Sequence, residues 1–345
     1  MKKKIIFGTF LLLLIIAGFV GFKIMGPAVT VKNSNFLFIR TGENLNAVKE
    51  NLVNQQFLKN LSWFNKVASL LKFKNVKPGR YELKSGMSLM QLVKMLRAGN
   101  QTPVKITIIK ERTKELLAGK MGKKFETECD SLRMIQFLGN NDSLKKFGVD
   151  TNTVIAIIMP YTYQVMWNST PEKIFQQFYT AYKKFWNTER KIKADSLHLS
   201  PLQVSTLASI VEEETNRLSD KGNVASTYLN RLKIGMKLQA DPTVKFVTRN
   251  FQLGRIMGSH LKLNSPFNTY LNAGLPPGPI CTPSVESIEA VLNAPKTDYL
   301  FFVASHKFDG STIFTTNFAD HTKFVKLFHA EQNRRADSLR KLKDK

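Results

Sequence analysis

The sequence predicts an α+β protein with one N-terminal transmembrane helix, a small α+β module after it and a larger mixed α+β domain. Three observations lead to this fold class. The chain begins with an uncharged apolar run from Ile5 to Phe22. Short strand candidates and segments with helical spacing of apolar residues follow each other along the rest of the chain. The 345 residues, 43% of them hydrophobic, are enough to form about two domains with buried cores.

The composition indicates an anionic partner or surface. Lys and Arg number 51 against 26 Asp and Glu, which gives a formal net charge of +25. Cys129 and Cys281 lie far apart, without a CxxC pair or a nearby Cys/His cluster. This spacing argues against a disulfide scaffold and against a zinc site, and the sequence predicts neither a metal nor a cofactor.

The N-terminal segment predicts an uncleaved membrane anchor over residues 1–25. Three lysines, Lys2 to Lys4, precede the apolar run, whose eighteen residues are just enough to span a bilayer as a helix. A cleaved signal peptide would have a shorter apolar core and an Ala-x-Ala-like site, and neither is clear here. The positive-inside rule places the lysines in the cytoplasm and the rest of the chain outside the inner membrane. Nucleic acid is therefore not an expected partner.

Residues 26–34 are predicted to be a short linker, and residues 35–102 a small module. The expected elements of the module are a strand at 36–39, helices at 44–54 and 62–71, a turn at 77–79, a strand at 80–83 and a helix at 88–97 that ends at Gly99. The alternation predicts a compact α+β fold of roughly 65 residues.

Residues 103–329 are predicted to be the larger domain, and residues 330–345 a charged, solvated helical tail. Ser200, Pro201 and Gln203 have the form of a capping box, so a helix should begin there and continue past Glu213, buried by its wide apolar arc. The other expected elements are a strand at 104–109, an apolar run at 154–159, helices at 171–186 and 222–234, a buried strand at 299–304 and a strand at 312–316 that pairs with it.

Glu212, Glu213 and Glu214 follow one another at the end of the apolar helix. Successive helical residues point about 100° apart, so the three carboxyls cannot share one environment. A carboxyl at the edge of an apolar wall loses hydration and can keep a proton near neutral pH, which is what protonation of a glycosidic oxygen requires. The alternative, that all three are surface charges at a helix end, stays open on periodicity alone.

Later loops carry further polar candidates. The segment 238–243 could bind a sugar or form an Asx turn, and the proline-rich loops 266–270 and 274–280 could line a cleft or join core elements. Asn317 and His321 follow the last strand, where a lone histidine is more often structural than catalytic. The chain contains no Gly-rich phosphate loop, HExxH or GxSxG, which excludes kinases, zinc proteases and serine hydrolases of the common types.

The segment Ala208–Thr215 resembles the signature of the MltG-type (YceG-like) endolytic murein transglycosylases. The similarity continues in order through residues 230–244, 268–270, 274–280 and 315–317, and it includes His321. It covers roughly residues 35 to 330. Residues 35–102 are similar to the LysM-like subdomain of that family.

The resemblance implies cleavage of the bond between N-acetylmuramic acid and N-acetylglucosamine in nascent strands, with a 1,6-anhydro end as product, which would terminate strand elongation. It also implies that Glu212 is the catalytic acid and base. The implied substrate-binding residues are Glu214, Asn230, Gln239, Asp241, Thr243, Asn268, Tyr270, Asn317 and His321. The implied partners are peptidoglycan strands, the membrane and peptidoglycan synthases.

Two segments depart from the family pattern. Pro-Glu-Gly is replaced by Lys110-Glu111-Arg112, and Pro-Asp-Thr-Tyr by Pro160-Tyr161-Thr162-Tyr163. Two other functions also remain open at this stage. One is a hydrolase in which Asp241 positions water, and the other is a non-catalytic envelope scaffold that binds glycan through the LysM-like module.

Overall fold

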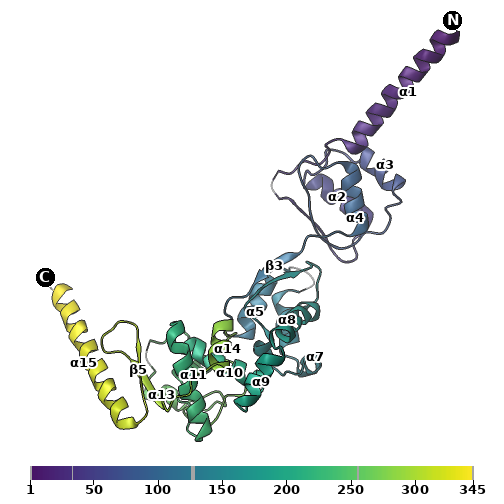
Figure 1. Cartoon of the computed structure of the whole chain (residues 1–345). Coiled ribbons are helices and arrows are strands. Elements are labelled where there is room, and N and C mark those ends of the chain that lie inside the picture. The colour runs from purple at the N-terminus through teal and green to yellow at the C-terminus, as the bar shows by residue number, and fades with distance from the viewer. Residues whose placement is uncertain (1, 33, 126–128, 255, 344–345) are drawn as a thin grey trace. The chain divides into compact units, whose positions relative to one another are not determined.

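The computed structural model describes residues 2–32, 34–125, 129–254 and 256–343 (Figure 1). The chain divides into two compact units. Unit 1 takes its residues from Met1–Ile106, Met121–Asp130 and Gln164–Ile174, and unit 2 from Thr107–Lys120, Ser131–Tyr163 and Phe175–Lys345. Unit 1 thus includes the predicted module and two segments of the predicted larger domain.

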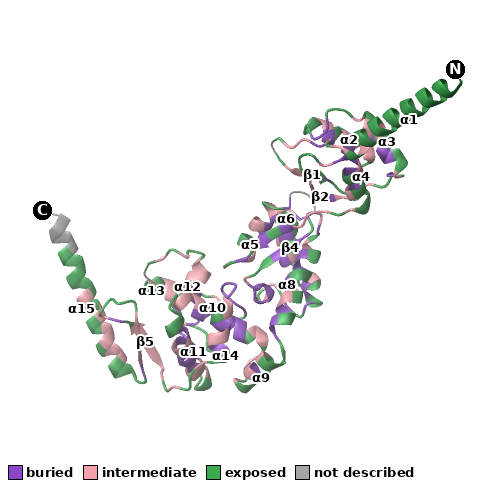
Figure 2. Cartoon of the chain, turned by 45° about the horizontal axis from the view of Figure 1, so that its top comes forward, coloured by how far each residue is buried: buried purple, intermediate pink, exposed green. Residues whose placement is uncertain are grey.

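The predicted N-terminal helix is present as α1 (Lys2–Met25). None of its residues is buried, and Figure 2 shows it as an almost wholly exposed element although its sequence is apolar. Among the described residues it is the one helix long and apolar enough to cross a membrane. An exposed apolar helix of this length is stable in a bilayer rather than in water.

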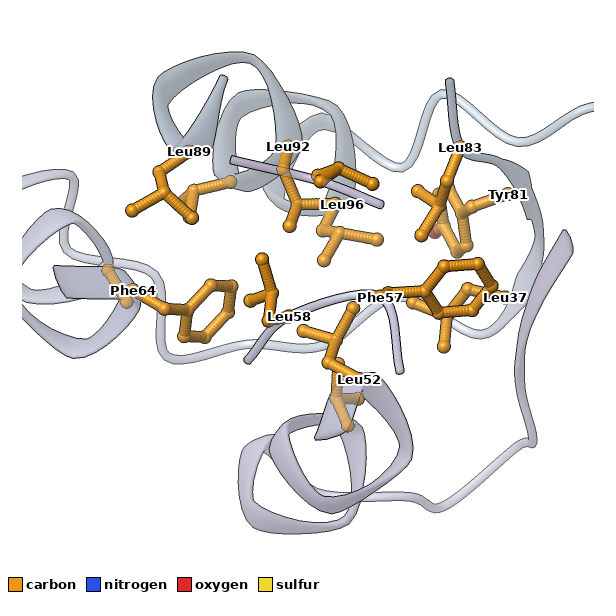
Figure 3. Close-up of a cluster of buried hydrophobic side chains, with 14 of the residues drawn as sticks. Leu37, Leu52, Phe57, Leu58, Phe64, Tyr81, Leu83, Leu89, Leu92 and Leu96 are labelled. Carbon is orange, nitrogen blue, oxygen red and sulfur yellow. The ribbon is translucent and has the colours of Figure 1, made fainter. Parts of the chain in front are cut away.

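Unit 1 has a two-stranded antiparallel sheet, β1 (Phe36–Ile39) with β2 (Gly79–Glu82), covered by three helices. The helices are α2 (Leu45–Asn54), α3 (Ser62–Leu70) and α4 (Leu89–Ala98). Asn44 caps α2, while Ser88 and Gln91 form a capping box on α4. Figure 3 shows the core between these elements, where Leu37, Leu52 and Tyr81 are fully buried. All the elements predicted for this module are confirmed within one or two residues.

The prediction of a linker at 26–34 is wrong for the described part of that segment. Val29 is 3% exposed and belongs to the core of unit 1. The backbone N–H groups of Ala28 and Val29 donate to the carbonyl of Met87, and Thr30 donates to Phe57. A Gly-Pro start indicates a turn, but only the tertiary contacts show that the residues after it are packed. Residue 33 of this segment, like residues 344 and 345 of the predicted tail, lies outside the described residues.

Unit 2 is mainly helical. The strands β3 (Val104–Thr107) and β4 (Thr162–Val165) form a two-stranded sheet. The remaining elements are α5 (Lys114–Gly122), α6 (Ser131–Leu138), α7 (Asn141–Lys145), the 3₁₀ helix η1 (Val154–Ile157), α8 (Pro171–Phe185), α9 (Thr188–Ser196), α10 (Pro201–Glu214), α11 (Leu218–Lys233), α12 (Asp241–Thr248), α13 (Gly258–Leu261), α14 (Val285–Leu292), β5 (Phe301–Ala304), β6 (Thr312–Thr315) and α15 (Phe318–Lys343).

Helix α10 is the central element of unit 2. Its predicted capping box is confirmed, because Ser200 accepts from the N–H of Gln203 and Gln203 accepts from the N–H of Ser200. The eight residues from Val204 to Val211 are all buried, because α10 packs against α11, α12 and α14. The helix therefore has a fixed position up to its last turn, where the three glutamates begin.

Strands β5 and β6 pair antiparallel as predicted, but the prediction that the first is buried is wrong. All four β5 residues are partly or fully exposed, since the two-stranded sheet has α15 against it and no further strand. Helix α11 begins four residues before its predicted start at Gly222. The predicted helical tail is the end of α15, which is continuous from Phe318 to Lys343.

We expect Val29→Asp to destabilise unit 1 by several kcal/mol, because the new carboxylate would have to be buried without a partner. Lys32→Asp is the matched control, because Lys32 is exposed in the same segment and the change should alter stability by less than about 0.5 kcal/mol. Thermal unfolding of the two variants in detergent measures the difference. Equal melting temperatures would show that the segment is a linker after all.

Candidate active site

The three glutamates at the end of α10 point in different directions and have different partners, as the helical step of about 100° predicts. Glu213 pairs with two cations. Its carboxylate accepts two-pronged hydrogen bonds from the Arg112 guanidinium at 2.9 to 3.2 Å and lies 3.1 Å from Lys110 Nζ. Both cations come from the segment that departs from the family pattern, so these substitutions have a polar role in this chain.

Glu212 is held by three donors on one oxygen. Lys221 Nζ donates to its Oε2 at 2.7 Å, and the hydroxyls of Ser284 and Ser287 each donate to the same oxygen at 2.5 Å. Ser284 caps α14, so the carboxylate also lies at the positive end of that helix.

Burial acts to raise the pKa of Glu212, but the hydrogen bonds from Lys221, Ser284 and Ser287 together outweigh burial and hold the pKa below its ordinary value. This direction is opposite to the one expected for a carboxyl that keeps a proton near neutral pH. The same hydrogen bonds tie α10 to α11 and α14. The catalytic role of Glu212 stays a prediction.

Glu214 has the opposite environment. Its pKa is raised to about 7, first by desolvation on burial and also by the charge of Asp241, while the hydrogen bond from Tyr228 acts to lower it. The phenol of Tyr228 donates to Glu214 Oε1 at 2.5 Å. The side chain is only partly exposed. Glu214, two residues beyond Glu212, is thus a carboxyl whose pKa lies close to neutral pH.

Glu214 lines a cavity of about 280 Å³, which is near the lower end of ligand pockets and suits a unit the size of one sugar ring. The polar side chains of the lining come from α10, α11, α12, α15 and two loops, and the phenylalanines from β5 and α15. The lining residues are Glu214, Tyr228, Arg231, Gln239, Asp241, Tyr270, Phe301, Phe302, Phe318 and His321.

A second carboxyl faces the cavity opposite a phenol. Tyr270 donates its hydroxyl to Asp241 Oδ1 at 2.6 Å. Burial first, and then this hydrogen bond and the charge of Asp241, raise the pKa of Tyr270, so the phenol stays protonated and remains a donor. Asp241 is the first residue of α12, where the helix dipole favours a carboxylate.

His321 stacks on Phe301, with ring centroids 5.2 Å apart. Desolvation and the neighbouring Arg231 lower the pKa of His321, so its imidazole is neutral at pH 7. Its Nδ1 is buried and has no hydrogen-bond partner among the described residues. A neutral imidazole with a free nitrogen can bond a ligand hydroxyl.

The structure brings together five of the residues proposed from sequence to bind substrate, namely Glu214, Gln239, Asp241, Tyr270 and His321. The other four hold the backbone around the cavity. Asn230 donates to the carbonyls of Thr297 and Tyr299, and Asn268 donates to those of Leu261 and Leu263. The hydroxyl of Thr243 donates to the carbonyl of Ala240 and bonds the hydroxyl of Thr269. Asn317 caps the start of α15, where its side chain bonds Asp320.

Sequence reasoning missed five lining residues, which are Tyr228, Arg231, Phe301, Phe302 and Phe318. Tyr228 and Arg231 are three residues apart on α11 and so share a face, a spacing that could have indicated them. The guanidinium of Arg231 donates to the carbonyls of Leu300 at 2.7 Å and Leu238 at 2.5 Å. The phenylalanines come from the exposed β5 and α15, which periodicity did not place at a site.

The other segment that departs from the family pattern, residues 160–163, forms hydrogen bonds with the segment 107–108. Thr107 and Thr162 bond through their hydroxyls at 3.0 Å, and the N–H of Ile108 donates to the carbonyl of Tyr161. Both cysteines are buried, and burial raises the pKa of Cys281 well above its usual range, so its thiol is unreactive. Within the described ranges, no group of three His, Cys, Asp or Glu side chains is placed to hold a metal ion.

The fold and the cavity define an α+β protein with an apolar N-terminal helix and a cavity lined by two carboxyls at the end of a buried helix. The model of the YceG-like family matches residues 37–327, and the chain belongs to this family.

Individual relatives agree with this assignment. The chain is 28% identical over 317 residues to an endolytic murein transglycosylase of Bacillus subtilis, covering 86% of this chain and 85% of the relative. It is 26% identical over 356 residues to the endolytic murein transglycosylase of Streptococcus pneumoniae, of which it spans 64%. A crystal structure of a putative YceG-like protein from Listeria monocytogenes is similar with a TM-score of 0.56 and 25% identity, over 84% of this chain and 97% of that one.

The raised pKa of Glu214 predicts a pH dependence of stability. Between pH 4.5, its ordinary pKa, and pH 7 the folded protein holds a proton on Glu214 that the unfolded chain releases. The free energy of unfolding should therefore fall as the pH rises through this window, by up to about 3 kcal/mol at 1.36 kcal/mol per pKa unit. In Glu214→Gln this loss should be absent.

The measurement is the difference in unfolding free energy between wild type and Glu214→Gln at several pH values from 4 to 8, which removes the contributions of the other titrating groups. A difference that does not change with pH would mean that Glu214 has an ordinary pKa.

Proposed function

We propose that this chain is an endolytic peptidoglycan lytic transglycosylase whose catalytic acid and base is Glu214. One observation carries the choice of residue: a carboxyl with a pKa of about 7 lines a sugar-sized cavity and has an aromatic wall facing it. The activity itself is supported by the family and by the relatives described as endolytic murein transglycosylases.

In the first step, protonated Glu214 gives its proton to the glycosidic oxygen between N-acetylmuramic acid and N-acetylglucosamine. The bond from that oxygen to the anomeric carbon breaks, and the N-acetylglucosamine side leaves as an alcohol. The carboxylate then takes the proton from the 6-hydroxyl of the same muramic sugar, whose oxygen bonds to the anomeric carbon. The product is a 1,6-anhydro end, Glu214 is protonated again, and no water is consumed.

The anomeric carbon becomes positive as the bond breaks, and Asp241 is the carboxyl in the cavity that can stabilise this charge. The phenol of Tyr270 fixes its orientation through the 2.6 Å hydrogen bond. Tyr228 donates to one oxygen of Glu214, so the proton that Glu214 transfers is on the other oxygen, Oε2.

The remaining lining residues suit a saccharide. The rings of Phe301 and Phe318, with centroids 5.7 Å apart, offer apolar faces to the C–H side of a sugar. His321 and the Gln239 amide also line the cavity, and side chains of these types bond hydroxyl and acetamido groups. The backbone of Gln239 has a φ of 50°, in the left-handed region that residues other than glycine rarely adopt. Such backbone conformations cluster at functional sites.

We assign α1 as a single-pass anchor in the inner membrane, with Lys2 to Lys4 in the cytoplasm and both units on the outer side. The order β1-α2-α3-β2 with one antiparallel pair supports the interpretation of this module as LysM-like. Peptidoglycan synthases stay a predicted partner, and the carboxylates of peptidoglycan and of anionic lipids suit the charge of +25.

The function is tested by mass spectrometry of the products from purified glycan strands. Wild-type protein should release fragments whose new ends are anhydro ends, each lighter by one water than a hydrolysed end. Glu214→Gln should reduce the rate at least about 100-fold, because it removes general acid–base catalysis. Its melting temperature should not fall, since the amide replaces a carboxyl that is neutral in much of the pH range.

Glu212→Gln is the matched control, two residues away on the same helix. It should lower stability by about 3 kcal/mol, because buried Lys221 loses its countercharge, but keep most of the activity of the folded fraction. An inactive, folded Glu212→Gln beside an active Glu214→Gln would reverse the assignment. Products with only hydrolysed ends would refute the transglycosylase.

A further inference from the structure

The end of α1 is in contact with helix α3 of unit 1. The rings of Phe19 and Trp63 meet edge to face with centroids 6.2 Å apart. Figures 1 and 2 both show α3 beside the end of α1 from which the chain enters unit 1. The contact therefore joins a residue of the apolar run to a helix of the folded module.

The position of Phe19 within α1 fixes the depth of this contact in a bilayer. At about 1.5 Å per residue the run from Ile5 to Phe22 is about 27 Å long, close to the roughly 30 Å hydrocarbon thickness. Phe19 lies three residues, or about 4.5 Å, before the end of the run. If α1 spans the bilayer, Phe19 is at the edge of the hydrocarbon layer, and Trp63 must be at the same level.

The side chains around the contact are those that favour this level. Lys23 Nζ lies 5.4 Å from the Phe19 ring centroid and Lys66 Nζ 4.3 Å from the Trp63 centroid. Trp63, Lys66 and Leu70 are three and four residues apart, so they share one face of α3. Leu70 is 65% exposed on that face, while Phe64 and Val67 turn into the core. Tryptophan rings and lysines with apolar stems are enriched at membrane interfaces.

The chain between α1 and the module leaves α3 little freedom to move away from the membrane. The N–H of Gly26 donates to the carbonyl of Phe22 at 2.8 Å, and that of Val29 to Met87 at 3.0 Å. Ile24, still within α1, packs against the core of unit 1, as does Trp63. The transmembrane helix and the module therefore share one core.

We propose that the face of α3 formed by Trp63, Lys66 and Leu70 binds the outer surface of the phospholipid bilayer that α1 spans. Trp63 lies at the boundary between acyl chains and headgroups, Leu70 contacts the acyl chains, and the ammonium groups of Lys66 and Lys23 meet lipid phosphates. Unit 1 is then seated on the membrane instead of held away from it. This inference rests on the membrane anchorage proposed above and adds a second membrane contact to it.

The test is quenching of tryptophan fluorescence by brominated lipids in the full chain reconstituted into vesicles. The chain has three tryptophans, and the other two, Trp167 and Trp186, are 4% and 2% exposed in the protein. Bromines placed near the headgroup end of the acyl chains should quench wild-type emission more than bromines near the bilayer centre. Trp63→Phe is the matched control, because it keeps an aromatic ring against Phe19, and it should lose the depth-dependent quenching.

The proposal is overturned if wild type and Trp63→Phe are quenched equally while the protein stays in the vesicles after an alkaline wash. It is also overturned if the wash removes the protein, because α1 is then no anchor. A second variant, Leu70→Glu, should reduce the quenching of Trp63 by shallow bromines, since a carboxylate opposes contact with acyl chains. Glycan cleavage by each variant is measured in detergent, so failure of the enzymatic function is seen separately from failure of membrane contact.

Discussion

The active site depends on the burial of α10. Eight consecutive residues of this helix, Val204 to Val211, are removed from water between neighbouring helices, so its last turn cannot rotate or shift. The helical step of about 100° then sends the three following glutamates to three separate environments. Glu213 meets two cations, Glu212 the start of α14, and Glu214 the cavity. A one-residue shift of the helix would exchange these environments.

Two carboxyls at the end of one helix therefore have pKa values shifted in opposite directions. Glu212 receives a buried ammonium and two hydroxyls on a single oxygen, and these donors outweigh its desolvation. Glu214 receives one hydrogen bond, from the phenol of Tyr228. Desolvation and the charge of Asp241 both raise its pKa. Environments that push neighbouring pKa values apart separate a structural role from an acid–base role.

Much of the local structure could be predicted from the sequence, because its causes are local. The strands and helices of unit 1, the capping box of α10 and the pairing of β5 with β6 follow from apolar periodicity and from side chains that bond the nearest backbone groups. The packing of residues 26–32 and the exposure of β5 could not be predicted, because both depend on what lies against a segment after the chain has folded.

The sequence by itself determined the apolar N-terminal helix, the family and the place of three adjacent glutamates: eighteen uncharged residues and an ordered set of motifs need no coordinates. Only the tertiary structure decided which groups surround each glutamate, and therefore in which direction the pKa of Glu212 and that of Glu214 shift. A carboxyl's pKa depends on the groups within a few ångströms, and those of Glu214 and Glu212 come from helices and loops up to about 75 positions along the chain, such as Tyr228, Asp241, Lys221 and Ser287. Periodicity gives the direction in which a side chain points, but it does not give the groups that surround the side chain in the folded protein.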